Sequence, residues 1–343
     1  MKARARLFAE RKFRDAAPGR SAADLAADFV PPPGCSVEDV AAAIEEMRNP
    51  AASSVRLSDA ELRAQEYRAL VNGLAEEGAE GTGAAGKQFL CIEQDLAGSG
   101  LPEIVTQVSR VSRLREVRAL YGFSRITPAS SDDQVIPVSE ADPTWLPAIE
   151  VMGEGVFVRF DEDRLSEFLD SDFARRRLAQ LVDSNSLASA GSSMTRVQGI
   201  DIRMVTLHSL AHALLDELSL TAGYPAASLR ERVYADDGQA GILIYTATAD
   251  SAGSLGGLAS LSEPDRLSAI LASAIRRARW CTTDPVCIET TSSGVDGMNL
   301  AACHACLLLP ETSCEHFNLL LDRALLVGEL TDPTIGLFGA SID

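Results

Sequence analysis

The sequence has no long apolar run and very few lysines. No segment approaches the run of about 18 apolar residues that a transmembrane helix requires, which excludes an integral membrane protein. Only three of its 31 basic residues are lysines, and 49 acidic residues give the 343-residue chain a net charge of −18. This charge excludes a protein that binds nucleic acid over its whole surface. The 46% hydrophobic content is ordinary for a folded globular chain.

The basic start of the chain is not followed by an apolar segment. Seven of the first twenty residues are Lys or Arg, but the hydrophobic stretch of a secretory signal does not follow them. We therefore expect a cytoplasmic protein in a reducing compartment, with no membrane partner. In such a compartment clustered cysteines bind metal more often than they form disulfides.

The order of capping residues, periodic segments and glycines predicts an α+β fold. Ser36 is expected to cap one helix, and Ser58 with Glu61 forms a capping box that opens another. Helices are expected over 37–48, in a segment that begins at 59, in a region that follows residue 160 and ends at 187, over 200–222 and over 264–279. Strands are expected over 88–95, within 145–160 and over 241–248. Within 145–160 we expect two strands joined through Gly153-Glu154-Gly155.

Composition divides the chain into three parts. A glycine- and serine-bearing loop at 189–193 places one boundary near residue 190. We expect a helical and basic extension over 1–57, a helix-plus-sheet domain with an Arg-rich segment over 58–190, and a third domain over 191–343 that ends in a cysteine-rich zinc-binding subdomain.

The segment 101–126 is locally basic in an acidic protein. If it is helical, Val108, Val111 and Leu114 recur at a spacing of three on a buried side, and guanidinium groups line another side. A confined basic patch is what an acidic DNA-binding protein needs. Pairing of these arginines with carboxylates elsewhere is the alternative. The candidate DNA-binding residues are Arg110, Arg113, Arg115 and Arg118.

Five of the seven cysteines crowd into residues 281–314. Cys303 and Cys306 have the Cys-x2-Cys spacing that lets two thiolates meet one tetrahedral ion, and Cys281 with Cys287 offers a second, looser pair. Four thiolates predict a structural zinc site whose metal contributes to folding. Iron–sulfur ligation is an alternative, although the looser pair matches neither common ferredoxin spacing. Burial as small apolar side chains would explain one or two cysteines, but not five.

His208 and His212 are four residues apart on an expected helix and therefore share a face. Ser209 stands where a metallopeptidase helix carries its glutamate, so a protease is not predicted. Packing or hydrogen bonding within the core is the favoured interpretation of the pair. A metal-dependent nuclease or phosphoesterase that uses these histidines and the loop at Asp250 is the enzymatic alternative.

Several strings together resemble the DrmB proteins of the DISARM antiphage defence system and, more distantly, the zinc-binding region of MrfA-type repair helicases. They are RVSRLREVRALYGFSRI at 110–126, WLPAIEVMGEGVFVRF at 145–160, HSLAHALLDEL at 208–218, SLRERVY at 228–234, GILIYTATADSAGSLGGL at 241–258, CTTDPVCIE at 281–289 and the segment 299–328. The resemblance covers roughly residues 60–330 in consistent order. It implies that the domain at 191–343 is helicase-associated.

The resemblance also implies a site and a role. The family's cysteine motif falls on Cys281, Cys287, Cys303 and Cys306, with Cys314 as a fifth candidate that could displace one of them. The implied function is that of a non-catalytic zinc subunit that associates with an SNF2-like DNA helicase and contributes DNA binding. Helicase ATPase motifs are not recognisable, so no ATP hydrolysis is expected. The chain is short for DrmB, and a partner is therefore expected.

Overall fold

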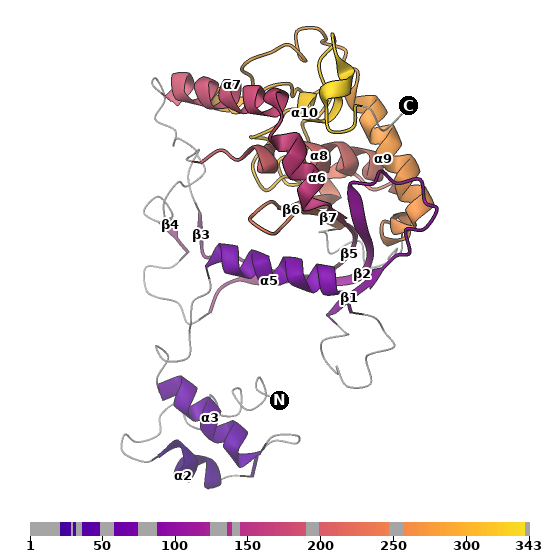
Figure 1. Ribbon diagram of the computed structural model, residues 1–343. Helices are drawn as coiled ribbons and strands as arrows, with labels where there is room; N and C mark the ends of the chain where they lie inside the picture. The colour runs from indigo at the N-terminus through magenta and orange to yellow at the C-terminus, as the bar shows by residue number, and fades with distance from the viewer. Residues whose placement is uncertain are drawn as a thin grey trace. The chain divides into compact units, whose positions relative to one another are not determined.

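The chain folds into two compact units, Met1–Leu62 and Arg63–Asp343, in the computed structural model (Figure 1). The structure describes residues 21–28, 30–31, 36–48, 58–74, 88–123, 136–138, 145–189, 199–246 and 257–339. The boundary expected near residue 190 lies outside the described residues. Among them, no helix is both long enough and apolar enough to cross a membrane.

A pair of helices forms the core of the first unit. Helix α2 (Ala22–Ala27) and helix α3 (Val37–Arg48) bury Leu25, Val40 and Ile44 against each other. The Ser36 hydroxyl accepts a hydrogen bond from the backbone N–H of Asp39 at 3.1 Å, and the Asp39 carboxylate accepts one from the N–H of Ser36 at 2.8 Å. The predicted cap of this helix is therefore confirmed.

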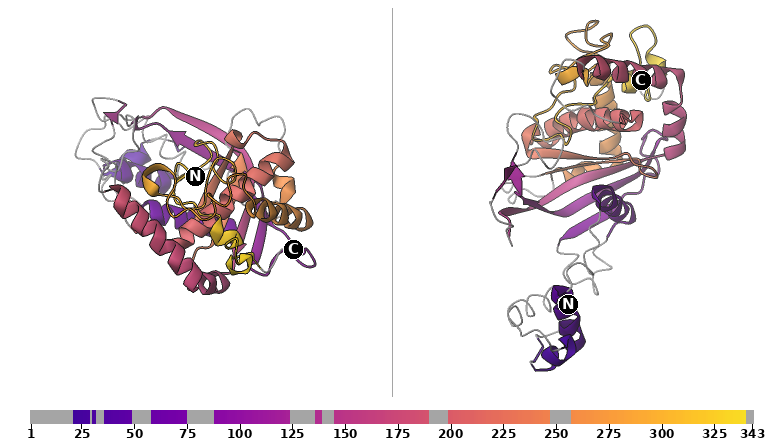
Figure 2. Two further views of the ribbon diagram at one scale, coloured as in Figure 1. Left: turned by 90° about the horizontal axis from the view of Figure 1, so that it is seen from above. Right: turned by 90° about the vertical axis from the view of Figure 1, so that its left-hand side faces the viewer.

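An antiparallel sheet of five strands lies at the centre of the second unit (Figure 2). Its spatial order is β1 (Phe89–Glu93), β2 (Val105–Ala119), β5 (Ala148–Phe160), β7 (Gly241–Thr246) and β6 (Leu229–Tyr234). A separate ribbon pairs β3 (Gly122–Phe123) with β4 (Ile136–Pro137). Strand β5 precedes residue 190 and pairs with β7, which follows it, so one sheet contains strands from both sides of that position.

The remaining elements are helical. They are α5 (Asp59–Asn72), α6 (Glu162–Leu169), α7 (Asp172–Ser189), α8 (Ile202–Ala222), α9 (Pro264–Ala278) and α10 (Ala324–Val327), with 3-10 turns at Ala226–Ser228, Ala259–Ser262, Val295–Gly297 and Pro333–Ile335. Glu61 accepts from the backbone N–H of Ser58 at 2.7 Å, which confirms the capping box. Gly223 ends α8 with a φ of 74°, the left-handed conformation that glycine adopts without strain. Together these helices and the sheet confirm the predicted α+β fold.

Both faces of the sheet are covered. Val156 and Val158 of β5 lie beside Ile244 and Ile242 of β7, and all four belong to the large core under α8 and α9. On the opposite face, Phe157 and Tyr234 pack with Tyr67 of α5, with ring centroids 6.0 Å and 5.4 Å from that tyrosine. The sheet is therefore the middle layer between α5 and the α8–α9 pair (Figures 1 and 2).

The Arg-rich segment is a strand, so the helical interpretation of 101–126 is wrong. Val108 and Val111 are both fully buried, but they belong to the cores on opposite faces of the sheet. A spacing of three residues places two side chains on opposite faces of a strand, and both are buried here because both faces are covered. The β-branched residues of this segment also favour a strand.

Residues 148–160 form one continuous strand, so the two-strand prediction is wrong. A Cβ at Gly153 would lie 2.3 Å from the carbonyl oxygen of Thr246, and one at Gly155 would lie 2.4 Å from that of Ile244. These glycines therefore permit close approach to β7 instead of forming a turn. Glu154 between them is buried, and its Oε1 accepts a hydrogen bond from the N–H of Leu258 at 3.0 Å.

Each outer strand of the sheet has a further backbone contact at its free side. Cys91 of β1 exchanges two backbone hydrogen bonds with Leu74, at 2.7 Å and 3.1 Å. Glu231 of β6 donates its backbone N–H to the carbonyl of Ser313 at 3.1 Å. The second contact brings the C-terminal segment onto the sheet directly beside Cys314.

Candidate metal centres

Four of the clustered cysteines converge from two loops that follow α9. Cys281 and Cys287 lie in the turns after this helix, and Cys303 and Cys306 lie on a tight turn closed by the 3.1 Å hydrogen bond from the N–H of Cys306 to the carbonyl of Cys303. Their four sulfurs lie within 4.8 Å of one another. The sequence predicted a metal site among the five clustered cysteines, and the fold brings these two pairs together.

The sulfur positions fit a tetrahedral metal ion. The Sγ–Sγ distances are 3.4 Å from Cys281 to Cys303, 3.8 Å from Cys287 to Cys306 and 3.7 Å from Cys303 to Cys306. Tetrahedral zinc with Zn–S bonds of about 2.3 Å separates its sulfurs by about 3.8 Å. The donor set and its spacing therefore fit zinc, with all four positions taken by protein ligands.

A buried arginine lies beside the four-cysteine cluster. Arg323 is fully buried, donates to the carbonyl of Ala278 at 2.7 Å and pairs with the Asp284 carboxylate. The pKa of Cys287 is lowered to about 5, first by a hydrogen bond from Cys306 and then by the charge of Arg323. A positive charge at this place offsets part of the negative charge that four thiolates bring around a divalent ion.

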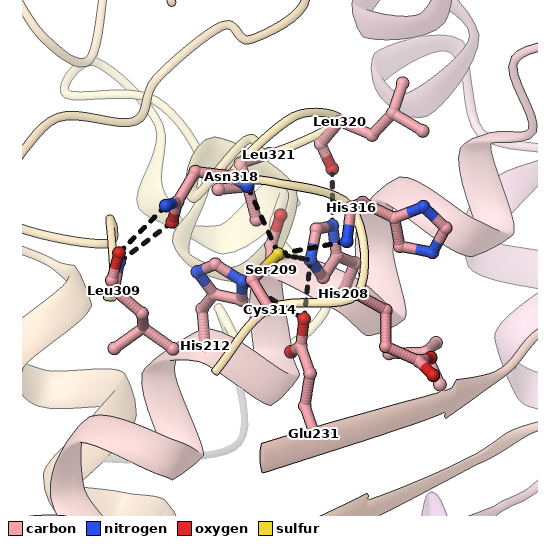
Figure 3. Close-up of polar contacts among 12 residues, drawn as sticks. His208, Ser209, His212, Glu231, Leu309, Cys314, His316, Asn318, Leu320 and Leu321 are labelled. Atoms are coloured by element: carbon pink, nitrogen blue, oxygen red, sulfur yellow. Dashed lines mark hydrogen bonds and ion pairs between the residues drawn. The ribbon is translucent and has the colours of Figure 1, made fainter. Parts of the chain in front are cut away.

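Cys314 lies apart from these four, with the two histidines of α8 (Figure 3). Its Sγ is 3.2 Å from Nε2 of His208, and the same Nε2 is 2.9 Å from Oε1 of Glu231. The expectation that Cys314 could displace a member of the four-cysteine cluster therefore does not match its position. The reason is that the chain passes from Cys306 to the edge of β6 before it reaches residue 314, where Ser313 contacts that strand.

Glu231 is the residue that sequence reasoning missed. It lies on β6 between Leu229 and Val233, at a position whose side chain points into the core, and it is 1% exposed. The available signal was the alternation itself, because a carboxylate in the inward register of an apolar strand must have a buried partner. The charges of His208 and His212 outweigh the effect of burial and lower the pKa of Glu231.

The two histidines are fully buried, and their ring centroids lie 4.5 Å apart. The sequence analysis favoured packing or hydrogen bonding of these histidines within the core, and both are hydrogen-bonded there. Both also lie beside the carboxylate of Glu231. Burial lowers the pKa of His208, but the charge of Glu231 and hydrogen bonds to Cys314 outweigh it and raise this pKa to about 10. Asp250, the other half of the enzymatic alternative, lies outside the described residues. A hydrolytic metal needs an open coordination position, which a fully buried group with four candidate ligands does not offer.

The four candidate DNA-binding arginines do not form one stripe. Arg110 lies opposite Val156 in register and contacts Glu263 at 3.7 Å, on the α8–α9 side of the sheet. Arg115 pairs with Glu150 at 2.7 Å, and Arg118 pairs with Glu116 at 2.6 Å. The Glu116 carboxylate also accepts from Tyr245, which lies on the α5 side. The register of β2 shifts between Val111 and Leu114, and this irregularity reverses the alternation of its side chains. Arg110 and Arg118 therefore lie on opposite faces, although they are eight residues apart.

The fold and the clustered cysteines define an α+β protein with a zinc-binding domain at its C-terminal end. A family model described as the MrfA Zn-binding domain matches residues 210–307, a range that contains all four members of the four-cysteine cluster. This match and the cluster support zinc as the cofactor, as the sequence predicted.

The chain is similar to the DISARM protein DrmB of Bacillus paralicheniformis (strain ATCC 9945a / NCIMB 11709 / CD-2). The two sequences are 36% identical over 234 residues, which is 64% of this chain and 40% of the relative. The resemblance to DrmB that the sequence motifs indicated is therefore confirmed. The chain spans about two fifths of the length of this relative.

Proposed function

We propose that this chain is a non-catalytic, zinc-containing component of a DISARM-type antiphage defence system. Its similarity to DrmB supports the assignment to such a system. The four-cysteine cluster within the matched zinc-binding domain carries the rest of the proposal, because four protein thiolates leave no position for substrate or water. Zinc bound there would act on folding and not on a substrate.

The ligands of this structural zinc are Cys281, Cys287, Cys303 and Cys306. The ion would fasten the turns after α9 to the tight turn at 303–306, a part of the chain with little regular secondary structure. Arg323 and Asp284 beneath it join the same turns to the core.

Metal analysis of single Cys→Ser variants tests the zinc ligands. Each of Cys281→Ser, Cys287→Ser, Cys303→Ser and Cys306→Ser should lose about one equivalent of zinc per chain and unfold at a lower denaturant concentration. Cys91→Ser is the matched control, because Cys91 is buried on β1 away from the cluster. Full zinc content in all four variants would refute this ligand set.

The proposed partners are an SNF2-like DNA helicase subunit and DNA. DISARM membership of the relative supports other components of such a system as partners. Val117 of β2 and Ile149 of β5 are exposed apolar side chains on opposite faces of this strand pair, and they support contact of a protein partner with its end. DNA contact would use Arg110, Arg113, Arg115 and Arg118. On binding, the ion pairs of Arg110, Arg115 and Arg118 with carboxylates would be replaced by ion pairs with DNA phosphates.

A salt titration of DNA binding by the complex with the helicase subunit tests the arginines. The double variant Arg113→Glu with Arg118→Glu should weaken DNA binding and reduce the slope of log K against log salt by about 2, because two phosphate contacts are lost. The matched control is Arg164→Glu with Arg175→Glu, which reverses two exposed arginines on α6 and α7. Equal affinity and slope in both double variants would assign the β2 arginines to structure alone.

A further inference from the structure

A second group of metal-binding side chains lies in the core, separate from the four-cysteine cluster. It consists of His208 and His212 of α8, Glu231 of β6 and Cys314 of the C-terminal segment (Figure 3). One ligand atom from each residue lies within 4.8 Å of the others, and all four residues are buried. Three parts of the chain that are distant in sequence therefore bring two imidazoles, a carboxylate and a thiol to one point.

The ring nitrogens are arranged for metal binding. Nδ1 of His212 is 2.8 Å from the carbonyl oxygen of Leu307, and Nδ1 of His208 is 3.3 Å from that of Leu320. A carbonyl only accepts, so each Nδ1 carries the hydrogen and donates it. A metal ion that displaces the second proton of each ring would then bind the lone pair of the other nitrogen, Nε2. Both Nε2 atoms face Glu231, at 2.9 Å and 3.3 Å from its Oε1.

The sulfur of Cys314 is surrounded by donors. It lies 3.3 Å from the backbone N–H of His316 and 3.2 Å from that of Asn318, and both groups donate to it. Two backbone donors on one sulfur stabilise a thiolate, which is the form that binds metal. The same segment is fixed at Ser313, whose carbonyl accepts from the N–H of Glu231.

Hydrogen bonding within the protein leaves part of this group unsatisfied. Among the described residues, Nε2 of His212 and Oε2 of Glu231 are buried and have no hydrogen-bond partner. A metal-free arrangement places at most one proton on Nε2 of His208, which can then serve either Glu231 or Cys314. Buried polar atoms without partners are costly. A cation between the four side chains would bind the imidazole of His212 and the carboxylate of Glu231, the two groups that contain the unpartnered atoms.

We propose that His208, His212, Glu231 and Cys314 form a second, closed metal site that takes a divalent transition metal of the zinc class. Two imidazole nitrogens, one carboxylate oxygen and one thiolate are borderline donors, which suit zinc better than magnesium or calcium. Four protein ligands and complete burial make the site structural. It joins α8 and β6 to the C-terminal segment. His208 and Cys314 lie outside residues 210–307, so the matched zinc-binding domain does not span this ligand set.

X-ray absorption of the wild-type zinc protein, combined with its metal content, tests the proposal without any substitution. Two zinc ions per chain should give an average of about 2.5 sulfur and about 1.5 nitrogen or oxygen ligands per ion. One ion per chain with four sulfur ligands would refute the second site and leave the four-cysteine site intact. One ion with mixed ligands would instead support the second site and refute the zinc of the proposed function.

Cobalt substitution separates the two sites. In Cys314→Ser and Glu231→Gln the chain should bind one equivalent of Co²⁺ instead of two, while the intense sulfur-to-cobalt absorption of the four-thiolate site remains. His304→Asn is the control, because His304 is an exposed histidine within the turn at 303–306. Retention of two equivalents in both variants would overturn the proposal. If a variant does not fold, the wild-type absorption measurement decides.

Discussion

Nδ1 of His212 is 2.8 Å from the carbonyl oxygen of Leu307, the residue that directly follows Cys306. A donor of the four-cysteine cluster and the group that orients a histidine of the second cluster are therefore neighbours on one tight turn. Movement of this turn would shift the carbonyl group that orients the His212 ring. The two clusters are thus mechanically connected, although they share no ligand.

This connection predicts that damage to the first cluster weakens the second. In Cys306→Ser, the affinity of the remaining site for Co²⁺ should fall about 10-fold to 100-fold, which is the usual effect of losing a group that orients a metal ligand. Competition against a chromophoric chelator measures the affinity. His304→Asn in the same turn should leave it unchanged. An unaltered affinity in Cys306→Ser would show that the hydrogen bond from His212 does not depend on the metal-bound turn.

Arg177 and Asp322 form a buried ion pair that joins α7 to the segment before α10. Their two hydrogen bonds are 2.7 Å and 2.8 Å long, and both side chains are at most 5% exposed. Arg177→Ala should lower the free energy of unfolding by about 3 to 5 kcal/mol, because it leaves a buried carboxylate without its partner. Urea denaturation measures this change.

The matched control for this prediction is Arg175→Ala on the same helix. Arg175 pairs with Asp172 at 2.9 Å, but both side chains are largely exposed, at 61% and 96%. Its removal should cost at most about 0.5 kcal/mol. An equal decrease in the free energy of unfolding for the two variants would contradict the prediction that the buried Arg177–Asp322 pair contributes more to stability than the exposed pair.

Gly155 of β5 should not tolerate a side chain. Its Cβ would lie 2.4 Å from the carbonyl oxygen of Ile244 and 2.9 Å from Cβ of Tyr245. Gly155→Ala should therefore destabilise the protein by about 3 kcal/mol or more, through separation of β5 from β7. Gly98→Ala is the comparison, since a Cβ there would meet no other part of the protein within 4 Å and only the φ of 74° opposes substitution. That variant should lose about 1 to 2 kcal/mol; thermal or urea unfolding ranks the two.

Cys91 makes stability depend on alkaline pH. Burial raises the pKa of its thiol from the ordinary value of 9.0 to about 11. The unfolded chain therefore releases this proton first as the pH rises, so the stability present below pH 9 falls between pH 9 and pH 11. The loss should be roughly 2 to 3 kcal/mol. Cys91→Ala should lack this component. Parallel curves of unfolding free energy against pH for the two proteins would contradict the raised pKa.

The parts of the structure that the sequence predicted are those controlled by local contacts. The caps at Ser36 and Ser58 depend on side chains three residues away, and Gly223 ends its helix through its own backbone conformation. The pairing of Cys303 with Cys306 is similarly local. The joining of that pair to Cys281 and Cys287 was implied by the family resemblance and not by spacing, because Cys314 is nearer to Cys306 in the sequence.

The parts that the sequence did not predict depend on contacts between distant segments. Val108 and Val111 had the spacing of a helix face because α5 covers one side of the sheet and α8 the other. Gly153 and Gly155 had the pattern of a turn, but in the structure their lack of a side chain allows the backbone of β7 to pack closely against β5. Glu231 and Cys314 meet His208 only after the C-terminal segment returns to β6. Local periodicity contains no information about these neighbours.

The contacts of Leu74 with β1 and of Ser313 with β6 also have a consequence for the behaviour of the protein at high concentration. An unoccupied outer strand presents a row of amide and carbonyl groups that a second molecule can extend into a continuous sheet. Here a foreign strand would have to displace Leu74 on one margin or the segment held at Ser313 on the other. Opening of the C-terminal segment would therefore expose β6 as a template for aggregation.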